Sequence, residues 1–178
     1  MVSIPKFHYK ADTTAKVAIC TPVRDFTTVL FTNSLANLTY KAGQAGQNVT
    51  INMIMGSEVT MQRQHLVDQA LETDCTHILW LDSDMSFPSN TLNALLSHDK
   101  DIIACNYSTR VPPHRPVAFR SKNDLDSRVY TGTGIQKIWA IGLGCMLVKR
   151  EVFETLEKPY FKISWDCLLY TSDAADDP

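Results

Sequence analysis

A chain of 178 residues with 44% hydrophobic residues can bury the core of one globular domain, and its length does not favour a second. Its formal net charge of −2 excludes the strong basic excess typical of proteins whose main partner is a nucleic acid. No apolar stretch approaches the roughly 20 residues that cross a bilayer, and the first residues lack the apolar segment of a signal peptide. We therefore expect a cytoplasmic protein with no transmembrane segment and no nucleic-acid partner.

Strand-like and helix-like patterns alternate along the chain, which is typical of an α/β fold with a mostly parallel central sheet flanked by helices. Alternating or continuous apolar residues predict strands, and apolar residues three or four positions apart predict helices. The strands are predicted over residues 16–22, 48–56, 78–81 and 101–108, and the helices over residues 27–43, 58–72 and 89–98. Ser57 is the expected N-cap of the second helix.

The regular pattern stops after residue 108. Residues 109–133 contain many Pro, Asn and Asp residues, which predicts a long excursion from the sheet or a small hairpin. Residues 135–157 return to a strand and then a helix, with Gly142 and Gly144 at the junction. The third glycine of a dinucleotide-binding G-x-G-x-x-G is missing, so we interpret the two glycines as positions of close backbone approach.

Aromatic, histidine and cysteine residues give no sign of a separate site. Trp80 and Trp139 fall in predicted strands and are expected in the core rather than on a sugar-binding surface. His65 and His77 lie beside apolar positions and are expected to be structural. The cysteines are scattered and form no C-x-x-C pair, which favours buried free thiols over a zinc site or disulfides. They are Cys20, Cys75, Cys105, Cys145 and Cys167.

Two aspartates follow directly after an apolar run, in the segment ILWLDSDM of residues 78–85. The run predicts a strand that is buried on both faces, so Asp82 and Asp84 lie where this strand meets solvent. Two carboxylates this close repel each other, and a helix N-terminus, a Lys or Arg side chain, or a divalent cation must compensate. Because ligands gather at the carboxyl ends of parallel strands, we expect residues 21–24 and 106–110 to converge on the two aspartates.

Aspartates at positions i and i+2 can share one hard cation with the oxygens of a diphosphate. The alternative is that Asp82 caps or pairs locally while Asp84 belongs to a turn. In the irregular region, Arg110, His114 and Arg115 either contact a diphosphate or an acceptor or are ordinary surface residues, and the sequence favours the surface interpretation.

Five segments, taken together, resemble glycosyltransferases of the GT-A fold. They are VAICTPVRD, MQRQHLVDQAL, THILWLDSDMSFPSNTLNALL, DIIACNYSTRVPP and IGLGCMLVKREVFETLEKPYF. These nucleotide-diphospho-sugar transferases, here of a family 2-like bacterial or phage-type branch, match roughly residues 16–162. The resemblance implies a Rossmann-like GT-A fold that is incomplete at its C-terminus.

The resemblance also implies roles for individual residues. Asp84 matches the aspartate that usually ligates Mn²⁺ or Mg²⁺, and Asp82 matches the one that faces the ribose or the same metal. The other positions expected to bind the nucleotide-sugar are Thr21, Pro22, Val23, Arg24, Arg63, Ser83, Gly142 and Gly144.

The chain departs from the family pattern in two places. In many relatives an acidic element holds the nucleobase of the donor, and this chain has Gly56, Ser57 and Glu58 there instead. The identity of the nucleobase therefore cannot be predicted. The acidic segment that supplies the catalytic base in inverting relatives is not found, and Asp166 is a weak candidate for that role. Residues 167–178, CLLYTSDAADDP, are similar to the translation of a sequencing adapter. We therefore expect a partial glycosyltransferase domain over 1–166 and a non-native tail over 167–178.

The sequence thus predicts a metal-dependent, hexosyltransferase-like enzyme that moves a sugar from a nucleotide-diphosphate donor to an unknown glycan, lipid or protein acceptor. A haloacid dehalogenase-type phosphatase is an alternative, because LWLDSDMS also fits its motif, with Asp82 as nucleophile and Asp84 as acid or base. Position disfavours it, since two strand-helix units precede the motif. Nucleotidyl transfer is disfavoured because CTPVRDFTT holds no glycine. A non-catalytic fragment that binds a sugar nucleotide remains the third possibility.

Overall fold

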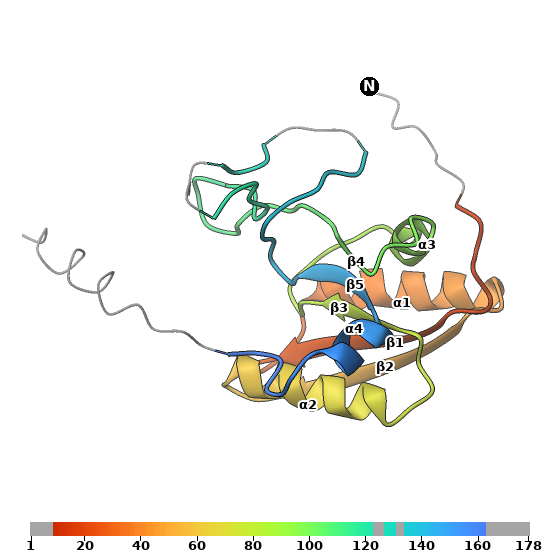
Figure 1. Cartoon of the computed structure of the whole chain (residues 1–178). Helices are drawn as coiled ribbons and strands as arrows, with labels where there is room; N and C mark the ends of the chain where they lie inside the picture. The colour runs from red at the N-terminus through yellow and green to blue at the C-terminus, as the bar shows by residue number, and fades with distance from the viewer. Residues whose placement is uncertain (1–8, 123–126, 131–133, 163–178) are drawn as a thin grey trace, which may run out of the picture.

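The computed structural model describes residues 9–122, 127–130 and 134–162 (Figure 1). Five strands and four helices are found in these residues. In chain order they are β1 (Lys16–Val23), α1 (Val29–Gln44), β2 (Asn48–Met55), α2 (Val59–Leu71), β3 (His77–Leu81), α3 (Thr91–Leu96), β4 (Ile102–Ala104), β5 (Cys145–Lys149) and α4 (Arg150–Thr155). None of the described helices is both long enough and apolar enough to span a membrane.

The strands form one open sheet in the order β2-β1-β3-β5-β4. Strands β1, β2 and β3 are parallel, and β5 runs antiparallel to both of its neighbours. The register pairs Ile19 of β1 with Ile51 on one side and Leu79 on the other. The expected α/β fold with a mostly parallel sheet is confirmed, and the carboxyl ends of β1, β2 and β3 meet at one edge.

Helices cover both faces of the sheet, with α1 and α3 on one face and α2 and α4 on the other (Figure 1). Side chains of the central strands alternate between two buried clusters, as strand geometry requires. Ile19 and Leu79 pack with Phe31 of α1, whereas Ile78 and Trp80 pack with the other cluster. Residues Ile78 to Leu81 are all buried, which confirms the prediction of a strand covered on both faces.

The helices begin and end within two residues of the predicted limits, but one cap differs. Ser57 was the expected N-cap of α2, and this prediction is wrong because Glu58 occupies the position. Its longer side chain accepts hydrogen bonds from the backbone N–H groups of Thr60 and Met61, at 2.9 and 2.6 Å. The side-chain hydrogen bond with Thr60, together with these two backbone bonds, holds the pKa of the Glu58 carboxyl below its usual range.

The fourth strand is shorter than predicted, since it ends at Ala104 instead of residue 108. Beyond it the chain leaves the sheet in an excursion, defined here by the described residues 105–122, 127–130 and 134–144, which rises away from the helices in Figure 1. The N–H of Cys105 still donates to the Cys145 carbonyl of β5 at 2.9 Å, whereas the Asn106 side-chain amide donates to the carbonyl of Val129 at 2.7 Å. The chain therefore turns from β5 toward the rest of the excursion at residue 106. Trp139 belongs to the excursion and is 56% exposed, so its expected place in a core strand is wrong.

The free thiols follow the prediction in most cases. Cys20, Cys75 and Cys145 are buried and unpaired, and Cys105 is half-buried. Burial raises the pKa of the Cys20 thiol to about 12, which keeps it protonated and unreactive. Cys167 lies outside the described residues, as do the tail over 167–178 and Asp166.

Gln62 ties the carboxyl ends of β1 and β2 together. Its buried amide donates to the carbonyls of Val23 and Ile54, at 2.6 and 2.7 Å. We expect Gln62→Leu to lower the free energy of unfolding by about 2 kcal/mol, because it leaves buried carbonyl capacity unsatisfied. Urea denaturation measures this effect, and Gln69→Leu, at an exposed position of the same helix, is the control. Equal stability of the two variants would contradict the assigned role.

Candidate nucleotide-binding site

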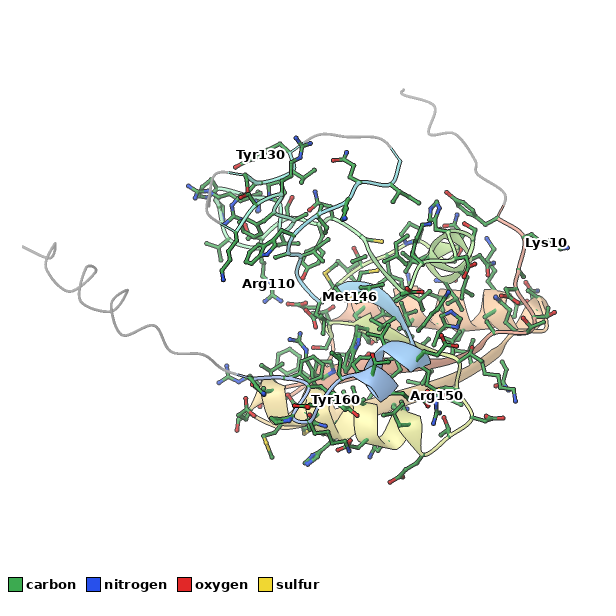
Figure 2. The ribbon with its side chains drawn as sticks, viewed as in Figure 1. Lys10, Arg110, Tyr130, Met146, Arg150 and Tyr160 are labelled. Atoms are coloured by element: carbon green, nitrogen blue, oxygen red, sulfur yellow. The ribbon has the colours of Figure 1, made fainter. Side chains whose placement is uncertain are left out.

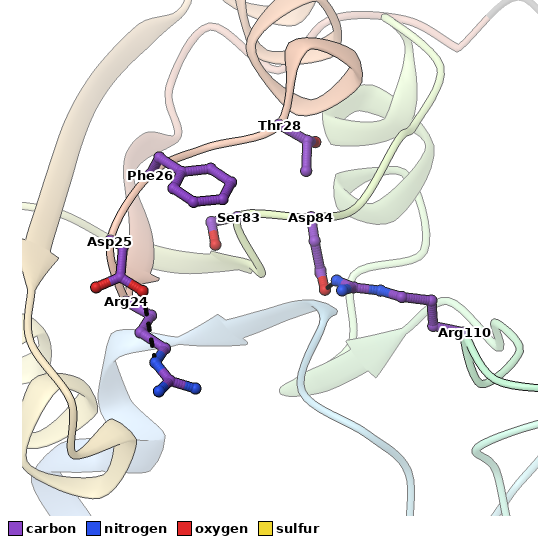
Figure 3. A pocket seen from close by; sticks show the side chains of 7 residues that line it. All are labelled: Arg24, Asp25, Phe26, Thr28, Ser83, Asp84 and Arg110. Atoms are coloured by element: carbon purple, nitrogen blue, oxygen red, sulfur yellow. Dashed lines mark ion pairs between the residues drawn. The ribbon is translucent and has the colours of Figure 1, made fainter.

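Two adjoining cavities lie at the carboxyl ends of β1, β2 and β3. Their volumes are about 290 and 250 Å³, and both are lined by Arg24, Ser83 and Asp84. The first also contacts the β1–α1 loop and Arg110, and the second contacts the start of α2 and Asp82 (Figure 3). Since parallel sheets bind ligands at this edge, the two cavities define the candidate site.

Asp82 is held by a partner from α2. Its carboxylate lies 3.1 Å from the guanidinium of Arg63, and both side chains are less than one third exposed. The Asp82 backbone N–H donates to the carbonyl of Gly144 at 3.0 Å, and its own carbonyl accepts from Met85 at 3.0 Å. The turn after β3 is therefore fixed on both sides. Arg63, which the resemblance placed on the donor side, does lie in the site.

Asp84 is paired with Arg110 from the excursion (Figure 3). The pair agrees with the expectation that residues 106–110 converge on the aspartates, and the Arg110 side chain is 73% exposed, as the surface interpretation favoured by the sequence implies. No periodic pattern in residues 109–133 indicates which way the Arg110 side chain points, so the sequence could not predict Asp84 as its partner. The two carboxylates are thus each compensated by a guanidinium, one of the possibilities that their repulsion required.

The N-terminus of α1 lies beside Asp84. Thr28 lines the first cavity, caps the helix by accepting from the Phe31 N–H at 3.2 Å, and donates its own N–H to the carbonyl of Ser83 at 3.1 Å. The first turn of α1 contains no acidic residue. By contrast, the carboxylate of Glu58 already occupies the N-terminus of α2. The positive end of the α1 dipole is therefore the one left for an anion.

Phe26 is a site residue that sequence analysis missed. It follows β1 in the loop before α1, lines the first cavity and is 77% exposed. Its ring faces the same space as Asp84 and Arg110 in Figure 3. An apolar ring left in water at the mouth of a cavity suits the face of a ligand base or sugar. The only available signal was an aromatic residue placed in a loop among polar neighbours.

The four predicted residues at the end of β1 divide into two groups. Pro22 and Arg24 line the second cavity, as the resemblance implies. Thr21 and Val23 are buried and line neither cavity, so the structure does not bring them to the ligand-accessible surface. Side chains alternate along a strand, and those of Thr21 and Val23 point into the covered interior.

Gly142 and Gly144 form a close contact with Tyr107, which lies in the segment 106–110 expected at the site but was given no role of its own. The N–H of Gly144 donates to the Tyr107 hydroxyl at 3.0 Å. A Cβ at Gly144 would lie 2.7 Å from this hydroxyl and 3.0 Å from the Asp82 carboxylate. Burial, with a smaller effect of the Asp82 charge, raises the pKa of Tyr107 and keeps it neutral. The two glycines line neither cavity and instead allow the excursion to pack beside Asp82.

The donor set suits a divalent cation that is shared with a substrate. Asp82 and Asp84 offer carboxylate oxygens, which Mg²⁺ and Mn²⁺ prefer. Within residues 9–122, 127–130 and 134–162, no cluster of three or more His, Cys, Asp or Glu side chains could hold an ion. In phosphate sites Mg²⁺ is commonly held by one or two carboxylates together with phosphate oxygens. The two aspartates fit this arrangement, provided that a diphosphate supplies further ligands.

No protein-family model and no curated protein matches the sequence. Among solved structures, the chain is similar to protein A197 from STIV, with a TM-score of 0.58 and 19% identity over 83% of this chain and 71% of that one. A glycosyltransferase involved in the glycosylation of the major capsid of PBCV-1 matches with a TM-score of 0.43 and 16% identity, over 78% of this chain and 62% of that one.

A third solved structure is 4-diphosphocytidyl-2C-methyl-D-erythritol synthase from Anaerococcus prevotii DSM 20548. It matches with a TM-score of 0.45 and 10% identity, over 92% of this chain and 85% of that one. At such identities, similarity concerns the fold alone, and the match to A197 shows that this fold occurs in another protein.

Gly144 tests the packing beside Asp82. We expect Gly144→Ala to destabilise the protein by about 1–3 kcal/mol, because the new Cβ collides with Tyr107. Gly43→Ala is the matched control. A Cβ at Gly43 meets no atom within 4 Å, and the helical position favours a gain of about 0.4–1 kcal/mol. Thermal unfolding of both variants measures the difference, and an unchanged Gly144→Ala melting temperature would contradict the close contact.

Proposed function

We propose that this chain binds a nucleoside-diphosphate sugar at the carboxyl ends of β1, β2 and β3 and serves as a glycosyltransferase domain. The observation that supports the proposal best is the pair Asp82 and Asp84 at the end of the buried strand β3. Beside the pair lie three arginines and the N-terminus of α1, which no carboxylate caps. The arginines are Arg24, Arg63 and Arg110. Carboxylates hold a cation that binds phosphate oxygens, and guanidinium groups bind phosphate oxygens directly. The site therefore offers two ways to bind a diphosphate.

The diphosphate binds between Arg24 and the first turn of α1. The guanidinium of Arg24 is exposed in both cavities, and its contact with Asp25, at 3.5 Å, is long and solvent-screened. The Nε of Arg63 is buried without a hydrogen-bond partner among the described residues. Unused donors at the edge of the site favour an oxygen-rich anionic ligand.

Asp82 and Asp84 hold a divalent cation, Mg²⁺ or Mn²⁺, together with the diphosphate. A cation held there would supply positive charge to balance the diphosphate leaving group. Asp82 keeps its orientation through Arg63 and the backbone of Gly144, so the carboxylate is preorganised. Asp84 is 40% exposed and lines both cavities, so its carboxylate is open to a ligand in either.

Transfer of the sugar also requires a base that deprotonates the acceptor. We assign no residue to this role, because Asp166 lies outside the described residues. The acceptor, whether glycan, lipid or protein, is likewise unassigned. A domain that binds the donor without transferring the sugar is compatible with the same site.

Asp84 provides the direct test of the cation site. We expect wild-type protein to bind uridine or guanosine diphosphate more tightly with Mn²⁺ than without it, and Asp84→Asn to lose this difference. Removing one of two carboxylate ligands should reduce affinity for the Mn²⁺ complex by at least about tenfold. Isothermal titration calorimetry measures both effects.

Asp101→Asn is the control for this experiment, since it removes an equal charge at the opposite end of the sheet, where Asp101 contacts Lys149. Two results would contradict the proposal. One is a wild-type protein that binds neither diphosphate in either condition. The other is hydrolysis of p-nitrophenyl phosphate that is lost in Asp82→Asn, which would favour the phosphatase alternative.

Substitution of Phe26 tests where the nucleobase of the donor binds. We expect Phe26→Ala to weaken nucleoside diphosphate binding by about tenfold, in the range of a lost base–aromatic stacking contact. Tyr40→Ala removes another exposed aromatic ring, from α1 but outside both cavities, and should leave the affinity unchanged. Competition against a fluorescent nucleotide measures both variants. Similar affinities for the two would place the base elsewhere.

A further inference from the structure

Arg110 is one of the three arginines of the proposed site, but the proposed function gives it no role of its own, and it is paired with one of the two carboxylates assigned to the cation. Its guanidinium contacts Asp84 in the first cavity (Figure 3). A divalent cation on Asp84 would neutralise the carboxylate that attracts Arg110 and would repel the nearby guanidinium, which favours opening of the pair. The question is where Arg110 then goes.

The ion pair is built to open easily. The Arg110 side chain is 73% exposed and that of Asp84 is 40% exposed, whereas the Arg63–Asp82 pair is much more enclosed. Exposed ion pairs contribute little to stability, because water screens them and both side chains lose freedom. The two pairs are therefore unequal, and Asp84 is the carboxylate that can change partner.

The loop around Arg110 holds its backbone in place. Thr109 donates its N–H to the carbonyl of Arg115 at 2.8 Å and accepts from the N–H of Arg115 at 3.0 Å through its hydroxyl. The imidazole of His114 lies 2.9 Å from the Thr109 carbonyl. Residues 109–115 thus close on themselves, and Arg110 can change partner by rotating its side chain without movement of the loop.

Arg110 lines the first cavity, and its guanidinium carries more N–H donors than its contact with Asp84 uses. Asp84 is its only recorded partner in the part of the chain that the structure describes. Figure 2 shows Arg110 on the side of the excursion nearer the sheet, with Tyr130 on the far side. A guanidinium that leaves Asp84 from this position enters the space between Arg24 and Thr28, where its planar donors match phosphate oxygens.

We propose that Arg110 is an exchangeable ligand of the site: it holds Asp84 while the site is free and binds the donor diphosphate once a divalent cation takes Asp84. The proposal rests on the proposed function. It makes Arg110 a competitor of the cation when no nucleotide is present, and a partner of the nucleotide when both are bound. An arginine with only a structural role would neither compete with the cation nor bind the nucleotide.

The test is the binding of two probes to Arg110→Gln. The first probe is Mn²⁺ alone, and electron paramagnetic resonance of the free ion measures its binding. The second probe is whichever of uridine diphosphate and guanosine diphosphate binds wild type more tightly, and calorimetry measures its binding at saturating Mn²⁺. We expect Mn²⁺ alone to bind up to about fivefold more tightly than in wild type, because its competitor is gone. The nucleoside diphosphate should bind at least about tenfold more weakly, because a hydrogen bond to a charged group is lost.

Arg115→Gln is the matched control. Arg115 is exposed on the same loop, has no carboxylate partner among the described residues and lines neither cavity, so both affinities should match wild type. Thermal unfolding checks that both variants are folded.

Three outcomes overturn the inference. Unchanged affinities for both probes in Arg110→Gln, with wild type binding both, would make Arg110 a surface residue while leaving the proposed function intact. Weaker binding of Mn²⁺ alone would mean that Arg110 supports the cation site instead of competing for it. A wild-type protein that binds neither Mn²⁺ nor the nucleoside diphosphate would contradict the proposed function and this inference together.

Discussion

The repulsion between two carboxylates at the end of a buried strand is the constraint on which this site depends. Asp82 and Asp84 follow β3 at the edge where three parallel strands end, and each is balanced by a guanidinium from another segment. Arg63 comes from α2 and Arg110 from the excursion that leaves the sheet after β4. The charge balance therefore joins the central strand, one covering helix and the irregular region in a single site.

The two helix N-termini near the site are treated differently, and this explains where an anion fits. Glu58 fills the donor positions of α2 with its own carboxylate. Thr28 caps α1 with a neutral hydroxyl, and no acidic residue follows in the first turn. A diphosphate would be repelled by the carboxylate at the N-terminus of α2 and attracted by the N-terminus of α1. The geometry thus favours one side of the aspartate pair for phosphate groups.

Local periodicity predicted much of the fold, because strands and helices buried against a common core repeat their apolar residues at fixed spacing. The placement of the aspartates followed from the parallel topology. Arg110 and Tyr107 lie in the segment that was expected to converge on the aspartates, but their individual contacts could not be predicted, and Trp139 was misplaced. The excursion has no period, and its contacts depend on distant residues such as Asp84 and Gly144. Thr21 and Val23 were assigned from resemblance, which gives the segment but not the direction of each side chain. Phe26 lies in a loop where no pattern distinguishes a ligand contact from an exposed ring.

The most direct test of a shared cation and diphosphate site is a crystal structure grown with Mn²⁺ and a nucleoside diphosphate, with anomalous scattering measured at the manganese absorption edge. Our account predicts an anomalous peak within about 2.3 Å of a carboxylate oxygen of Asp84, with diphosphate oxygens completing the coordination beside the N-terminus of α1. A nucleotide bound elsewhere, or a manganese ion that contacts neither Asp82 nor Asp84, would contradict it.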